Sequence, residues 1–101
     1  MPAFVRVAAV SDVAPGKVKL VSANGKMLAL CNVGGAFHAL DNVCAHRGGP
    51  LGEGFLAGEQ VECPWHGWQF NVKTGCMPMN PGVAVPTYEV KVEGSDVLVA
   101  I

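Results

Sequence analysis

Glycine and proline interrupt this chain at short intervals from one end to the other. The 101 residues include 13 glycines and 7 prolines, which separate short runs rich in valine, leucine, phenylalanine and tyrosine. No helical periodicity of apolar residues continues for a dozen residues, so no segment favours a long amphipathic helix. Short apolar runs bounded by turn residues are typical of β-strands. The sequence therefore predicts an all-β fold.

The expected strands follow from these runs and from the turns between them. Asn24-Gly25 can adopt the positive φ angles of a tight hairpin turn. Apolar and charged residues alternate over 88–93, which predicts one face of a last hairpin that turns at 94–96. A single helical turn is expected at 11–16, a long loop at 41–58, and an irregular or edge segment at 77–86 because of its prolines. The other expected strands cover residues 4–7, 18–21, 26–33, 36–40, 60–62, 68–72 and 97–101.

Length and charge exclude several classes of function. A chain of 101 residues has the size of one domain, so residues 1–101 are expected to form a single domain. The net charge is -1, which gives no positive field for nucleic acid. No apolar run approaches the roughly 18 residues of a membrane-spanning helix. No export signal is visible at the start, so we expect a cytoplasmic protein without membrane or nucleic-acid partners.

Two pairs of cysteine and histidine carry the chemistry. Cys44 and His46 form the first pair, and Cys63 and His66 form the second, with sixteen residues between His46 and Cys63. In a cytoplasmic protein, thiolates are more readily metal ligands than disulfide partners. Two thiolates and two imidazoles suit one tetrahedral zinc or a two-iron, two-sulfide cluster. The short spacing within each pair favours the cluster, and a zinc-stabilised binding module remains the alternative.

The segments around these pairs resemble the two cluster-binding boxes of Rieske [2Fe-2S] proteins. The first reads Cys-Ala-His-Arg-Gly-Gly-Pro over 44–50, and the second reads Cys-Pro-Trp-His-Gly-Trp-Gln-Phe over 63–70. The resemblance implies the Rieske iron–sulfur fold, an antiparallel β-sandwich with a small two-loop cluster-binding subdomain over about 41–82. It also implies one [2Fe-2S] cluster, with Cys44 and Cys63 on one iron and His46 and His66 on the other.

Mixed ligation makes such a cluster easy to reduce. Two ferric ions, two sulfides and two thiolates sum to zero charge, whereas four thiolates would give -2, so neutral histidines ease the uptake of an electron. Relatives in quinol-oxidising complexes carry a loop disulfide, where this chain has Gly49 and Trp65. They also carry a serine and a tyrosine that donate hydrogen bonds, where Trp68 and Phe70 stand here. Fewer donors predict a potential at the low end of the family range.

The resemblance implies a ferredoxin rather than an enzyme. Such a carrier would pass single electrons from a flavin-dependent ferredoxin reductase to a terminal ring-hydroxylating oxygenase in aromatic hydrocarbon catabolism. A small Rieske subunit of an assimilatory nitrite reductase is the alternative within the fold. An oxygenase iron site needs two histidines and a carboxylate, and His38 is the one histidine left outside the boxes. Arg47, Glu53 and Glu59 are candidate charges for orienting partners.

The remaining notable residues are expected to be structural. His38 is interpreted as a strand histidine with a local hydrogen-bond partner, and Cys31 as a small buried hydrophobe. A disulfide between Cys31 and Cys76 is possible but disfavoured in the cytoplasm. Trp65 and Trp68 either shield the cluster sulfides or pack the small subdomain. Pro81 resembles the family's proline loop, which covers the cluster.

Overall fold

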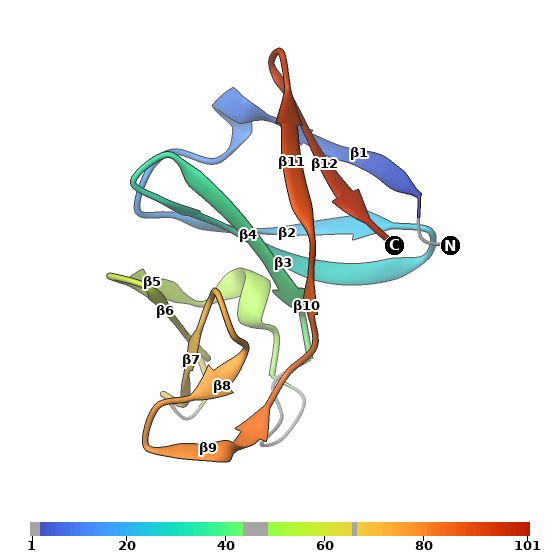
Figure 1. Ribbon diagram of the computed structural model, residues 1–101. Coiled ribbons are helices and arrows are strands. Elements are labelled where there is room, and N and C mark those ends of the chain that lie inside the picture. Colours follow the sequence, from blue (N-terminus) through green and yellow to red (C-terminus); the bar gives the residue numbers. More distant parts are fainter. Residues whose placement is uncertain (1–2, 44–48, 66) are drawn as a thin grey trace.

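Twelve strands make up most of the computed structural model, which describes residues 3–43, 49–65 and 67–101 (Figure 1). Every strand pair is antiparallel, and no α-helix occurs among the described residues, so the predicted all-β fold is confirmed. The strands are β1 (Phe4–Ala9), β2 (Val18–Ala23), β3 (Lys26–Val33), β4 (Ala36–Asp41), β5 (Phe55–Ala57), β6 (Gln60–Glu62), β7 (Gln69–Asn71), β8 (Cys76–Met77), β9 (Asn80–Ala84), β10 (Thr87–Tyr88), β11 (Val90–Glu93) and β12 (Asp96–Ala100). Two short 3₁₀ helices join them, η1 (Val10–Asp12) and η2 (Leu51–Glu53).

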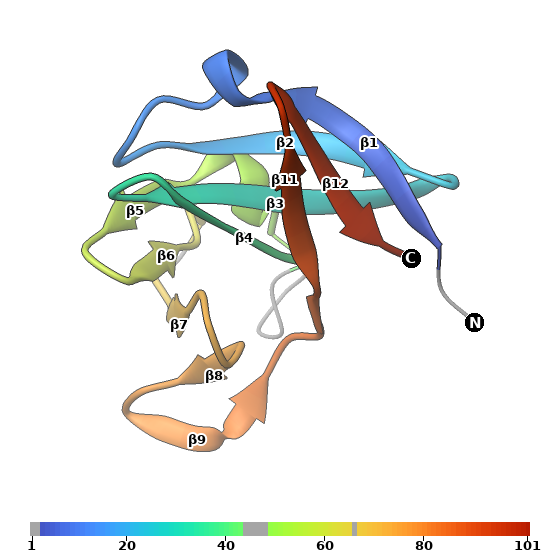
Figure 2. The same ribbon diagram turned by 45° about the horizontal axis from the view of Figure 1, so that its top comes forward.

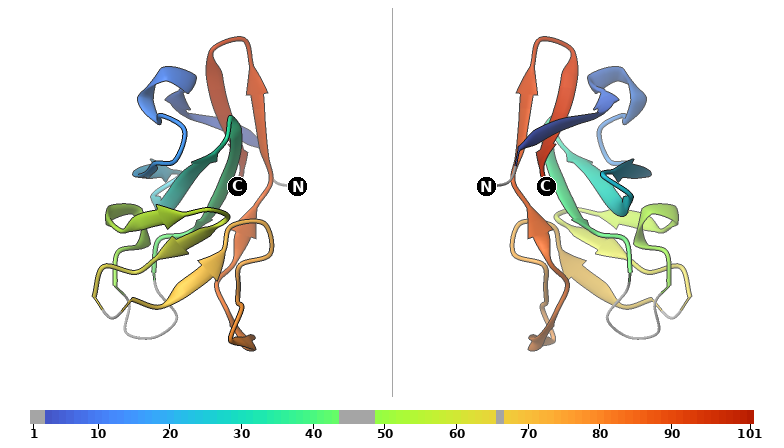
Figure 3. Two further views of the ribbon diagram at one scale, coloured as in Figure 1. Left: turned by 90° about the vertical axis from the view of Figure 1, so that its left-hand side faces the viewer. Right: turned by 90° about the vertical axis from the view of Figure 1, so that its right-hand side faces the viewer.

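A four-stranded sheet in the order β10-β4-β3-β2 lies at the centre of the molecule. Side chains of β3 and β4 are buried on both faces of this sheet, because alternate side chains of a strand point to opposite faces. One face packs against the three-stranded sheet β1-β12-β11, and the other faces the small sheets that contain β5 to β9 (Figures 2 and 3). The first face contributes Leu28, Leu30 and Ala39, and the second contributes Ala29, Cys31 and Leu40.

The hydrophobic core on the second face of the central sheet connects that sheet to the segments that carry the predicted ligands. It contains side chains from η2, β6, β7 and the segments after β6, β7 and β9, all less than 5% exposed. Phe70 is the largest fully buried side chain among the described residues, and Cys63 lies in the same cluster. The members from these segments are Leu51, Val61, Cys63, Phe70, Val72 and Val85. This core fixes the base of the small sheets on the central sheet.

Several sequence expectations are confirmed residue by residue. Asn24 has φ 50° and Gly25 has φ 77°, which is the tight turn predicted between β2 and β3. The single helical turn expected at 11–16 occurs slightly earlier, as η1 over Val10–Asp12, and the Asp12 carboxylate accepts a hydrogen bond from the Ala9 backbone N–H at 2.9 Å. The termini lie side by side, since Ala3 and Ile101 exchange backbone hydrogen bonds of 3.4 and 3.1 Å.

The prediction for the last hairpin is wrong in one respect, because residues 88–93, its expected first strand, do not form a single strand. Thr87 and Tyr88 pair with β4 in the central sheet, and Val90 begins the pairing with β12 in the other sheet. Figure 1 shows this segment rising from β9 through β10 into β11. The chain thus joins the two large sheets at Glu89, which alternation of residue types along one strand cannot reveal.

The expected loop at 41–58 and the irregular segment at 77–86 also contain more structure than predicted. β5 pairs with β6 over Phe55–Ala57, and β8 pairs with β9 despite the prolines. β9 belongs to a two-stranded sheet, so it pairs with a neighbouring strand along one edge alone. A proline, which has no backbone N–H to donate, is tolerated in such an edge strand. Within the described residues there is no helix with the length and hydrophobicity that crossing a bilayer requires.

Candidate metal centre

Cys63 opens a short closed loop between β6 and β7. Its backbone N–H donates to the Trp68 carbonyl at 2.8 Å, and the Gly67 N–H donates back to the Cys63 carbonyl at 3.0 Å. Gly67 has φ 74°, a left-handed conformation that favours glycine at this tight return. The hairpin below the loop is held by the Glu62–Gln69 pair, whose side chains hydrogen bond at 3.0 Å. The loop therefore holds Cys63 in one position relative to the sheet.

The end of the loop that carries the first predicted Cys/His pair adjoins this one. Val43 and Pro50, which lie on either side of its central residues, form an antiparallel bridge. Next to Pro50, the buried Gly49 lies so close to the second loop that a β-carbon added to it would be 2.6 Å from Cys63 Sγ. Cys44, His46 and His66, three of the four predicted ligands, lie outside the described residues, as does Arg47. The described residues thus place the second loop's thiol against the end of the first.

The environment of Cys63 suits a metal ligand. The residue is 2% exposed, and its thiol is free of any disulfide. Because Gly49 has no side chain, its backbone can lie close to the sulfur, where an added β-carbon would clash. One thiol cannot make a site by itself, and the described residues contain no group of three or more possible ligands. The buried free thiol of Cys63 and the side-chain-free residue beside it fit the cluster ligand predicted from the sequence.

The other two described cysteines are structural. Cys31 is fully buried in β3, and burial raises the pKa of its thiol to about 12, so it remains protonated and apolar. The Cys76 thiol is half-buried and donates a weak hydrogen bond to the Thr74 carbonyl at 3.9 Å. Both thiols are free, so the possible Cys31–Cys76 disulfide does not form.

Comparison with known proteins decides the family. The model of the Rieske [2Fe-2S] domain matches residues 3–89. The chain belongs to the Rieske [2Fe-2S] family. This Rieske protein is 37% identical over 99 residues to the ferredoxin component of the naphthalene 1,2-dioxygenase system of Pseudomonas putida, covering 95% of this chain and 93% of the relative. It is 41% identical over 100 residues to ferredoxin CarAc of Metapseudomonas resinovorans, covering 96% and 92%.

A solved structure agrees with these relatives. A chain in the complex of reduced oxygenase and oxidized ferredoxin in carbazole 1,9a-dioxygenase matches the Rieske protein with a TM-score of 0.86 and 38% identity. The match covers 99% of this chain and 94% of that chain. The predicted Rieske iron–sulfur fold is therefore confirmed, and the family carries an iron–sulfur cluster.

The candidate docking charges of the Rieske protein have different surroundings. The Glu59 carboxylate forms an ion pair with Lys73 at 2.8 Å, and the Lys73 ammonium lowers the pKa of Glu59. Glu59 also lies at the opposite end of β6 from Cys63. Glu53 is exposed in η2. Glu59 is therefore paired with Lys73 on the surface, whereas Glu53 is exposed; both stay predicted docking charges.

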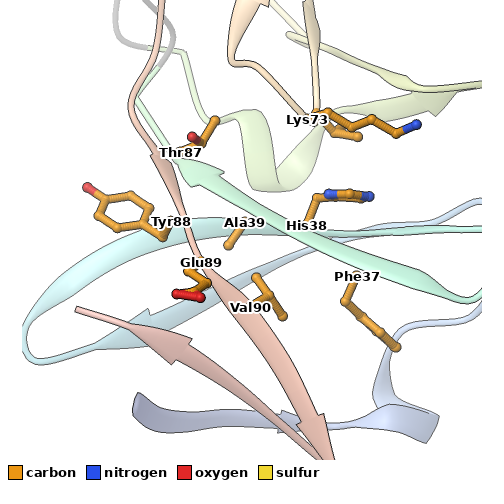
Figure 4. Close-up of a pocket in the computed structure, with 9 residues that line it drawn as sticks. Phe37, His38, Ala39, Lys73, Thr87, Tyr88, Glu89 and Val90 are labelled. Atoms are coloured by element: carbon orange, nitrogen blue, oxygen red, sulfur yellow. The ribbon is translucent and has the colours of Figure 1, made fainter. Parts of the chain in front are cut away.

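His38 does not have the local hydrogen-bond partner that the sequence suggested. Its Nε2 atom is buried and has no hydrogen-bond partner among the described residues. The side chain borders a cavity of about 310 Å³ between β4, Lys73 and the β10–β11 segment (Figure 4). The cavity exists because β10 pairs with Leu40 and Ala39 and then leaves β4 for the other sheet. Figure 4 shows the imidazole and the Lys73 side chain on the same side of this cavity.

This position makes stability depend on pH through His38. Burial lowers the pKa of His38 and the nearby Lys73 lowers it further, while Glu59 acts in the opposite direction. The unfolded chain, in which histidine titrates at about 6.5, therefore binds a proton before the folded chain does. Through His38, the free energy of unfolding is therefore highest above about pH 6.5 and decreases as the pH falls below that value. The melting temperature of His38→Gln should fall less than that of the wild type between about pH 7.5 and 5.5. Equal falls in the two proteins would contradict this assignment.

Proposed function

We propose that this Rieske protein is a one-electron carrier of the cytoplasm. It takes electrons from a flavin-dependent ferredoxin reductase and passes them to a terminal ring-hydroxylating oxygenase. The family match, together with relatives named as ferredoxin components of dioxygenase systems over almost their whole length, carries this proposal. The solved complex of an oxygenase with a ferredoxin supports the oxygenase as the partner. The same relatives favour this role over a nitrite reductase subunit or a zinc-stabilised module.

The proposed site holds one [2Fe-2S] cluster between the two loops. Cys44 and Cys63 are assigned to one iron, and His46 and His66 to the other. The buried free thiol of Cys63 and its closeness to the end of the first loop support a site shared by both loops. We place the cluster-binding subdomain at about 41–82 within a single domain over 1–101. The core formed by η2, β6 and β7 anchors this segment to the central sheet.

The protein's own part in electron transfer is to hold and insulate the cluster. When bound, the cluster accepts and donates one electron at a potential set by its ligands and their hydrogen bonds. Phe70, the last residue of the second box, is a fully buried hydrocarbon ring and offers no hydroxyl to a ligand sulfur. A carrier with few donors suits transfer to an oxygenase better than oxidation of quinols. Substrate chemistry is assigned to the partner, because the relatives are electron-transfer components.

A potential measurement tests this assignment. We expect a midpoint potential in the lower part of the Rieske range of roughly -150 to +300 mV, and below about +100 mV. Protein-film voltammetry on the purified protein measures it directly. A value well above +100 mV would place the protein with quinol-oxidising subunits.

Oxygenases of the naphthalene, biphenyl and carbazole systems, supplied with NADH and their own reductases, then test whether the protein supports ring hydroxylation in place of the native ferredoxin.

A further inference from the structure

Gly49 and Trp65 bring the two ligand-bearing loops into contact. A β-carbon on Gly49 would lie 3.1 Å from Cδ2 and 3.2 Å from Cγ of Trp65, in addition to 2.6 Å from Cys63 Sγ. The glycine backbone therefore packs directly against both the indole and the thiol. A β-carbon at those distances would force one of its neighbours to move.

Trp65 is an unusual surface residue. Its side chain is large and apolar, yet the residue is 57% exposed. The buried Gly49 packs against the indole, while much of the remaining surface of the residue is open to solvent. The closed turn from Cys63 to Trp68 fixes the backbone that carries the ring. The turn therefore places the base of the Trp65 side chain next to Gly49.

We propose that Trp65 is a positioning residue that holds the two ligand loops together across Gly49. The indole takes the space that a side chain at position 49 would need, and the Gly49 backbone also lies against the Cys63 sulfur. Loss of iron requires the two loops to separate, so a contact between them slows that loss. This role rests on the proposed ligand set, because it assumes that both loops bind the cluster.

The rate of iron loss tests the proposal without any partner protein. Oxidised holoprotein is mixed with excess chelator, and the first-order bleaching of its visible absorbance is recorded. We expect Trp65→Ala to lose iron about tenfold faster than the wild type, as for other residues that support metal ligands. Trp65→Phe, which keeps an aromatic ring over Gly49, should stay within about threefold. Val92→Ala is the control, because Val92 is apolar, 47% exposed in β11 and outside the cluster-binding subdomain; its rate should be unchanged.

A double-mutant cycle separates the loop contact from a general effect of each change. In a protein that keeps Trp65, the methyl group introduced by Gly49→Ala would press on the indole. In the Trp65→Ala background the same methyl group would meet no ring. Its approach to Cys63 Sγ is the same in both backgrounds and cancels in the comparison. We expect Gly49→Ala to accelerate iron loss at least about threefold more in the wild type than in Trp65→Ala, since residues in contact are non-additive.

Each outcome has a definite meaning. Iron loss from Trp65→Ala within twofold of the wild type, or equal effects of Gly49→Ala in both backgrounds, would overturn the proposed role of Trp65. If Gly49→Ala binds no iron, the comparison of Trp65→Ala with Trp65→Phe decides the question. Wild-type protein that binds no iron would instead contradict the proposed function, so the two failures are distinguishable.

Discussion

Replacing Cys63 by alanine is expected to leave the purified protein without its cluster. Cys63 is the one predicted ligand among the described residues, and it is buried with a free thiol at the point where the two loops meet. Removal of a thiolate leaves one iron without a full ligand set, and no other described cysteine lies in either box. Iron and labile sulfide should each fall below about a tenth of the wild-type content.

Cys76→Ala provides the matched control for this experiment. The Cys76 thiol is half-buried and donates a weak hydrogen bond to the Thr74 carbonyl, so the variant should keep the full iron content and the wild-type visible spectrum. Both variants are purified and reconstituted in parallel, and their folding is compared by circular dichroism. A Cys63→Ala protein with wild-type iron and an unchanged spectrum would remove Cys63 from the ligand set.

Phe70→Ala should cause the largest loss of stability of any single change considered. Phe70 is fully buried in the core that joins β7 to the central sheet, and alanine would leave a cavity there. Phe→Ala changes in protein cores cost about 3–5 kcal/mol of unfolding free energy. Urea unfolding under anaerobic conditions, monitored by tryptophan fluorescence, measures this loss of unfolding free energy.

Phe55→Ala is the natural comparison, because both phenylalanines lie in the sheet β5-β6-β7. Phe55 is 64% exposed, so its replacement should change the unfolding free energy by about 0.5 kcal/mol or less. A loss below about 1 kcal/mol for Phe70→Ala would show that this core is not what holds β7 on the central sheet.

The fold class and most strands could be predicted because they depend on local patterns. The strands expected over residues 26–33 and 60–62 have the bounds that the structure shows, since turn residues, glycines and a proline among them, flank both segments. Asn24-Gly25 specifies its hairpin by itself, because the positive φ angles of that turn favour these residue types.

The errors occur where tertiary contacts override the local pattern. β5 consists of Phe55–Ala57 between glycines, and its pairing with β6 supplies what its own composition lacks. The crossing at Glu89 depends on which sheet each half of the segment pairs with, and alternation of apolar residues is the same in either case. The cavity beside His38 follows from that crossing, so the orphaned Nε2 atom could not be foreseen either.

The candidate site could be recognised from sequence because metal chemistry restricts both residue type and spacing. The two Cys/His pairs are enough to indicate the family to which the chain belongs. The sequence also draws notice to Gly49 and Trp65, but it cannot show that they touch, since residues 16 positions apart in two loops meet through folding. The loop geometry around Cys63 is therefore the structure's own contribution to the site.

Electron paramagnetic resonance of the dithionite-reduced protein, combined with iron and sulfide analysis, tests the central claim most directly. The proposed ligation predicts two irons and two labile sulfides per chain and a reduced spectrum with a lower average g value than that of clusters with four thiolate ligands. A chain that holds no iron or sulfide after reconstitution, or that holds zinc instead, would contradict the account.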